Sequence, residues 1–125
     1  MIKIKILGIE KLQDRISNAQ EKLDAELRKG IEISAGWVLR QMQSNTPVDT
    51  GNLKSSEKID IAGNGFSALI GPNEEQASYA KFVEYGHHTR SGSWVPGQFY
   101  VEKTALETRN AVIEIFRDII KSLIK

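Results

Sequence analysis

A long stripe of apolar residues constrains the fold of this chain more than any other feature of its sequence. Apolar or small residues recur every three or four positions: Ile9, Leu12, Ile16, Ala19, Leu23, Leu27, Ile31, Ser34/Ala35, Val38 and Met42. This spacing predicts a helix over about residues 9–44, which at ~1.5 Å per residue would reach roughly 50 Å. Gly30 and Gly36 each weaken a helix by up to ~1 kcal/mol relative to alanine, so a bend or break is expected there.

Shorter elements are predicted on both sides of this helix. Alternating isoleucines and lysines in residues 2–7 predict a short strand before it. Thr46-Pro47 ends the helix, because the residue before a proline is pushed out of the helical region. Two strands are expected next, over about residues 53–62 and 66–71, joined by a turn at Gly63-Asn64-Gly65.

The second half of the chain is predicted to be mainly helical. Residues 77–85 are expected to form a short helix with Tyr79, Phe82 and Val83 facing inward and Gly86 closing it. Residues 87–97 have no apolar period, so a mobile loop or flexible hairpin is expected. A last helix is predicted over about residues 98–124. The predicted fold is one α+β domain of residues 1–125, with a small antiparallel sheet packed against a long N-terminal helix and a C-terminal helix.

Composition and charge narrow the classes of function. The 17 basic and 16 acidic residues leave a net charge of +1, and no segment concentrates positive charge, so sequence-specific nucleic-acid binding is not expected. No apolar run approaches the ~18–20 residues that cross a bilayer, and the first residues lack the apolar run of a signal peptide. The chain contains no cysteine, which excludes disulfides and thiolate metal sites. We therefore expect a protein made soluble inside a cell, without a membrane partner.

Asp49-Thr50-Gly51 is the tripeptide that carries the catalytic carboxylate of aspartic proteases. A retroviral-type protease of this length would be a homodimer that shares two such carboxylates. That chemistry belongs to an all-β fold, whereas here a long helix and Pro47 precede the tripeptide. We favour a structural turn formed by Pro47, Asp49, Thr50 and Gly51, in which Gly51 adopts a left-handed conformation.

No catalytic, cofactor-binding or metal-binding residue is assigned from the sequence. His87-His88, near Glu84 and Arg90, are the only histidines. Adjacent histidines point in different directions on most backbones, and a metal needs three or four convergent ligands. No dinucleotide-binding, phosphate-binding or zinc-protease motif is present either.

The aromatic residues near the predicted loop are better candidates for a functional surface. Trp37 lies one position off the main stripe of the long helix, at the edge of the core or on an exposed surface. Trp94 lies in a glycine-flanked loop, where it either packs locally or anchors a partner. The predicted interface residues are Arg90, Trp94, Val95, Phe99 and Tyr100.

Three runs in order along the chain resemble a known family: residues 46–56 (TPVDTGNLKSS), residues 79–86 (YAKFVEYG) and residues 96–105 (PGQFYVEKTA). They are similar to the tail-component family of HK97-type siphophages and prophages, whose members are described as head–tail joining, tail completion or minor tail proteins. The third run departs from the family pattern, with Glu102 and Lys103 where arginine and proline are usual.

The resemblance implies a structural subunit and not an enzyme. It implies a ring at the junction of portal and tail, six-fold like the tail tube, with neighbouring neck and tail-tube proteins as partners. Such a protein would be made in the cytoplasm of the host bacterium and then become part of the virion neck or tail. The alternatives are the aspartic-protease-like homodimer and a small host-interaction module.

Overall fold

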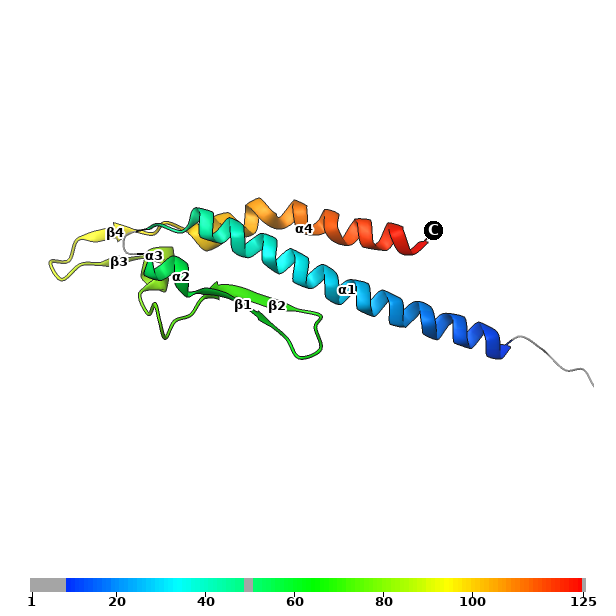
Figure 1. The fold of residues 1–125 in the computed structure, drawn as a ribbon. Helices are drawn as coiled ribbons and strands as arrows, with labels where there is room; N and C mark the ends of the chain where they lie inside the picture. Colours follow the sequence, from blue (N-terminus) through cyan, green and yellow to red (C-terminus); the bar gives the residue numbers. More distant parts are fainter. Residues whose placement is uncertain (1–8, 49–50, 125) are drawn as a thin grey trace, which may run out of the picture.

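The computed structural model describes residues 9–48 and 51–124, so the strand predicted over residues 2–7 and the residues Asp49 and Thr50 lie outside the described part of the chain. Figure 1 shows the order of the elements, which are α1 (Ile9–Asn45), α2 (Asn52–Ser56), β1 (Glu57–Ile61), β2 (Ala68–Pro72), α3 (Ala80–Tyr85), β3 (Gly86–His88), β4 (Trp94–Pro96) and α4 (Tyr100–Ile124). The predicted α+β class is confirmed: small antiparallel hairpins accompany a long N-terminal helix and a C-terminal helix.

The long N-terminal helix is one uninterrupted element of 37 residues. The bend or break expected at Gly30 or Gly36 is absent from α1. Gly30 is buried against Phe116 and Ile119 of α4, so the neighbouring helix supports the backbone at that point. The helix ends as predicted before Pro47, where the backbone N–H of Thr46 donates to the carbonyl of Met42 at 2.9 Å.

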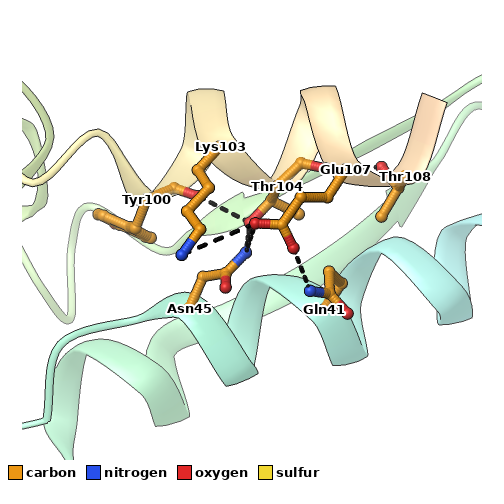
Figure 2. A network of polar contacts seen from close by, with 7 residues as sticks. All are labelled: Gln41, Asn45, Tyr100, Lys103, Thr104, Glu107 and Thr108. Atoms are coloured by element: carbon orange, nitrogen blue, oxygen red, sulfur yellow. Dashed lines mark hydrogen bonds and ion pairs between the residues drawn. The ribbon is translucent and has the colours of Figure 1, made fainter.

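α4 lies antiparallel beside the C-terminal half of α1 (Figure 1). Figure 2 shows polar contacts that join the two helices: the Asn45 amide donates to the hydroxyl of Thr104 at 3.1 Å, and the Gln41 amide donates to Glu107. α1 is longer than α4, with 37 residues against 25. The N-terminal part of α1 therefore extends past the end of α4 (Figure 1).

The first hairpin pairs β1 with β2 from Glu57↔Pro72 to Ile61↔Ala68. The Arg28 guanidinium lies 4.5 Å from the centre of the Phe66 ring, which ties the turn of this hairpin to α1. The strand predicted over residues 53–62 began four residues too early and ended one residue too late, and the strand predicted over residues 66–71 began two residues too early and ended one residue too early. Residues 52–56 form the single helical turn α2, which begins after Gly51 in the left-handed conformation expected for it (φ 84).

The core is small and lies where α1, α2, α3 and α4 meet. Its buried members are Met42, Leu53, Ala77, Ala80 and Tyr100. The face of α4 that packs on α1 also buries Thr104 and Thr108, whose hydroxyls donate to the carbonyls four residues before them, at 2.7 and 2.8 Å. These bonds satisfy the two hydroxyls, so the burial of both threonines is tolerated. Trp37, which was ambiguous in the sequence, is exposed on α1.

Candidate interaction surface

The short helix α3 turns a different face inward from the one predicted. Tyr79 and Phe82 were expected to face the core, but both are exposed, while Ala80 and Glu84 are buried and Val83 is half-buried. The prediction was wrong for the two aromatic residues because it assigned the inward face by hydrophobicity alone. The inward position on α3 is taken instead by the carboxylate of Glu84, which has a structural role.

That carboxylate caps α4. Glu84 accepts hydrogen bonds from the backbone N–H of Val101 at 2.9 Å and from that of Glu102 at 3.1 Å. The first N–H groups of a helix lack partners within the helix, and the positive end of the helix dipole favours a negative charge there. Glu84 therefore fixes the start of α4 against α3.

Residues 86–96 form a second hairpin, which projects from the end of the molecule opposite the start of α1 (Figure 1). β3 pairs with β4 from Gly86↔Pro96 to His88↔Trp94, and the backbone N–H of Thr89 donates to the carbonyl of Ser93 at 2.8 Å. The residues predicted as a loop or flexible hairpin are thus a hydrogen-bonded hairpin. Their predicted mobility stays a prediction.

Phe99 is the only residue other than glycine with a positive φ among the described residues, at φ 50. This conformation costs roughly 1–2 kcal/mol for an L-residue with a side chain. The backbone N–H of Phe99 donates to the carbonyl of Glu84 at 3.1 Å, and its carbonyl accepts from Lys103 at 2.9 Å. The strained turn leaves Phe99 exposed and its neighbour Tyr100 only 1% exposed.

The position of Tyr100 corrects one predicted interface residue. It is a core residue of its own chain, so it is not available as a contact to a partner. The other four predicted residues, Arg90, Trp94, Val95 and Phe99, are all exposed at this end of the molecule.

We define the aromatic surface as Tyr79, Phe82, Tyr85, Trp94 and Phe99, each between 39% and 66% exposed. The rings of Tyr85 and Phe99 lie edge to face with centroids 6.4 Å apart, so residues from α3 and from the start of α4 meet here. The sequence indicated Trp94 and Phe99, but not the three aromatic residues on and beside α3. Their spacing of three residues, from 79 to 82 to 85, was the available signal.

Both histidines contact aromatic rings. His87 lies 5.8 Å from Phe82, and His88 lies 4.9 Å from Trp94 across the hairpin, measured between ring centroids. Within residues 9–48 and 51–124, no group of three or more histidine, aspartate or glutamate side chains is placed to hold a metal ion. The Lys81 ammonium lies 5.3 Å from the Phe82 ring and adds a positive charge beside the surface.

The size and chemistry of the aromatic surface suit a protein partner. Five aromatic side chains of about 150–250 Å² each, roughly half exposed, present roughly 400–600 Å². A standard protein–protein interface buries about 800 Å² per partner, and its energetic centre is enriched in tryptophan and tyrosine. This surface could therefore form the centre of such an interface.

The tripeptide at 49–51 lies between two helices, α1 and α2. Gly51 is described, and its carbonyl accepts the backbone N–H of Ser55 at 3.0 Å. Helices on both sides differ from the all-β surroundings that aspartic-protease chemistry uses. The described helices also include none that is both long enough and apolar enough to cross a bilayer.

Comparison with known proteins gives one family. A family model described as "Bacteriophage HK97-gp10, putative tail-component" matches residues 10–86, which is more than half of the chain. The match runs from α1 through α3 and ends at the first residue of β3. No curated protein and no solved structure matches the chain.

Proposed function

The chain belongs to the HK97-gp10 family of bacteriophage tail components, and from this premise we propose that it joins head to tail, or completes the tail, as a subunit of a ring. The proposed role is structural and needs no catalytic group. The assembly takes place in the cytoplasm of the host bacterium, and the subunit remains in the neck or tail of the virion.

The observation that carries the proposal is the aromatic surface. An exposed aromatic cluster at one end of an elongated subunit is costly to leave in water, and contact with a neighbour removes that cost. In a ring, every subunit uses two different faces, one toward each neighbour. The aromatic surface supplies one of these faces, with Trp94 on the projecting hairpin as its anchor.

The partners in this proposal are other copies of the chain, together with the neck and tail-tube proteins on either side of the ring. The six-fold symmetry implied by the family resemblance is the expected stoichiometry. Arg90 lies at the tip of the hairpin and is exposed. It is therefore placed to contact an acidic group of an adjacent protein.

Complementation in the phage that encodes the chain tests the proposal. Deleting the gene should give filled heads and separate tails, and supplying the wild-type chain should restore joined particles. The Trp94→Ala variant should restore at least ten-fold fewer infectious particles. Trp37→Ala is the matched control, because Trp37 is also an exposed tryptophan but lies on α1 outside the aromatic surface.

Two results would contradict the proposal. Infectious particles that form at normal yield without the chain would remove its role in joining or completing the tail. Equal complementation by the Trp94→Ala and Trp37→Ala variants would remove the aromatic surface from the assembly.

A further inference from the structure

A line of exposed apolar residues runs along α4, away from its packed face. Leu106, Ile113 and Ile120 are spaced seven residues apart on α4, and Phe99 lies seven residues before Leu106, immediately before the helix begins; we call these four residues the apolar seam. They are between 42% and 69% exposed, whereas Tyr100, Thr104 and Thr108 on the packed face are almost completely buried. α4 thus has a second apolar side, and this side is not covered by the packing of α4 on α1.

The seam is hollowed along its second half. Val112, Ile113, Phe116 and Ile120 line a shallow apolar groove of about 420 Å³, with Arg117 and Lys121 at its rim. At its other end the seam begins with Phe99, which also belongs to the aromatic surface and contacts Tyr85. The two surfaces are therefore continuous.

The spacing of the seam indicates what covers it. Apolar residues seven apart along a straight helix form a nearly linear ridge, which is the pattern that packs against another helix at a small crossing angle. A strand or a loop does not follow a seven-residue period. The expected occupant is a helix that lies along α4 for about two heptads.

The exposed area of the seam approaches what a stable contact requires. The four side chains of the seam together present roughly 250–400 Å² of apolar surface. Since about 60% of an interface is apolar, a contact over the seam buries roughly 400–700 Å² per partner. A standard interface needs about 800 Å² per partner, so the seam supplies most of it.

The chain itself carries a helical segment with the matching spacing. Gln41 contacts Glu107, and Asn45 contacts Thr104. The two helices are therefore antiparallel, and a residue further along α4 lies beside a residue correspondingly earlier in α1. The end of α4, Ile124, therefore lies beside about residue 24 of α1. Residues 9–23, which we call the overhang, extend beyond it (Figure 1).

The overhang has its own apolar line. Ala19 is exposed and Leu23 is partly exposed, and the sequence continues the same spacing back through Ile16, Leu12 and Ile9. Positions 9, 16 and 23 are seven apart, as are positions 106, 113 and 120. Each set spans 14 residues, or about 21 Å of helix.

We propose that the apolar seam of α4 binds the α1 overhang of a second copy of this chain. The overhang points away from α4 of its own chain, so a continuous rigid helix cannot fold back onto the seam. One copy therefore offers a helix and the next offers the seam, which is a contact between two different faces. This inference rests on the proposed assembly of several copies and identifies a second contact within it.

Disulfide cross-linking tests the contact directly, because the chain has no native cysteine. If the helices are antiparallel with Leu23 beside Leu106, Ala19 lies beside Asn110. If they are parallel with Leu23 beside Ile120, Ala19 lies beside Phe116, and Arg117 is the adjacent position at the rim of the groove. The concentrated Ala19→Cys variant is therefore mixed separately with Asn110→Cys and with Arg117→Cys and oxidised.

One of the two mixtures should give at least ten-fold more mixed disulfide than the control mixture of Ala19→Cys with Ser91→Cys, whose second cysteine lies in the exposed β3–β4 turn. Mixed disulfide at the control level in both mixtures would overturn the proposal. A dominant disulfide between two copies of Asn110→Cys or of Arg117→Cys would also overturn it, because α4 would then pack on α4.

A charge within the seam provides the matched comparison. Adding Ile113→Glu to the α4 cysteine variant should lower the mixed disulfide at least ten-fold, whereas Leu69→Glu, at an even more exposed apolar position on β2, should leave it unchanged. If the ring forms but the mixed disulfide does not, the seam contact is wrong and the proposed function is unaffected. Normal phage assembly without the chain contradicts the proposed function, whatever the cross-linking result.

Discussion

Gly30 of α1 lies directly against Phe116 of α4, with no room between them for a side chain. A β-carbon at Gly30 would come within 2.9 Å of the Phe116 ring and 2.6 Å of Ile119. Helix propensity alone predicts that alanine stabilises this position by up to ~1 kcal/mol. Because overpacking costs about 1–3 kcal/mol, we predict instead that Gly30→Ala lowers the free energy of unfolding, measured by denaturant titration.

Gly36→Ala is the control for this prediction. A β-carbon at Gly36 meets no atom within 4 Å, so only the gain in helix propensity remains. Gly36→Ala should raise the free energy of unfolding by up to ~1 kcal/mol. Equal stabilisation by both substitutions would mean that α1 and α4 do not pack as closely as described.

Removing the cap of α4 should destabilise the end of the molecule that carries the aromatic surface. We predict that Glu84→Ala lowers the free energy of unfolding by roughly 0.5–2 kcal/mol, because two N–H groups lose their acceptor. Glu102→Ala removes a nearby exposed carboxylate that accepts neither bond, and it should change stability by less than about 0.5 kcal/mol. Thermal and chemical unfolding of the two variants would test the difference.

Glu57 is expected to make the stability of the fold depend on pH. Burial raises the pKa of this carboxyl above its ordinary value of 4.5, and the Thr46 hydrogen bond and the charge of Lys54 only partly oppose the effect. The Thr46 hydroxyl oxygen lies 2.6 Å from both the Glu57 carboxylate and the Met42 carbonyl, and its single proton cannot serve both acceptors. A protonated Glu57 can donate to Thr46 and resolve this conflict.

When folding raises the pKa of a group, the proton on that group favours the folded state. Its full contribution to the free energy of unfolding is present below the pKa of the unfolded state. The contribution is lost as the pH rises through the pKa of the folded state. Glu57→Gln keeps a neutral side chain at all pH values. We therefore predict that the variant is more stable than wild type at pH 7 and that the difference shrinks toward pH 4. Unfolding titrations across this range would show it, and a difference that is independent of pH would contradict it.

Trypsin should cut the β3–β4 hairpin of the isolated subunit well before it cuts the helices. Arg90 is exposed in a turn, and ordering such a segment costs on the order of 1 kcal/mol per residue. We expect cleavage after Arg90 before any cut within α1 or α4, identified by mass spectrometry. The Arg90→Gln variant should lose this early product and keep the later ones, and a first cut within a helix would show that the hairpin is firmly held.

Asp49 is predicted to be structural. Replacing Asp49 with alanine should lower the free energy of unfolding by roughly 0.5–2 kcal/mol, the range for lost turn and cap hydrogen bonds. The purified wild-type chain should show no peptidase activity. Pepstatin-sensitive cleavage that disappears in the Asp49→Ala variant would restore the protease alternative.

The two long helices were predictable because their apolar residues repeat over many turns. α2 was not, since a helix of five residues is too short to show a period, and its sequence was assigned to the following strand. The buried Thr104 and Thr108 were missed for a different reason. They satisfy their hydroxyls on their own helix, which an apolar pattern does not reveal.

The candidate surface was only partly predictable. Trp94 and Phe99 were indicated by their position in a segment rich in glycine. Phe99 and Tyr100 are adjacent aromatic residues, and only the left-handed backbone at Phe99 sends one outward and the other into the core. The burial of Glu84 depends on the end of a helix 17 residues further along, which no local pattern contains.

The uninterrupted length of α1 has a consequence for the dimensions of any assembly. Its 37 residues measure roughly 55 Å at ~1.5 Å per residue. A helix without a break works as a fixed spacer, so its first residue and the end next to the aromatic surface stay at a constant separation. Inserting seven residues before Leu23 would keep the apolar spacing and lengthen this spacer by about 10 Å, so the diameter or height of the particle should change by a corresponding step.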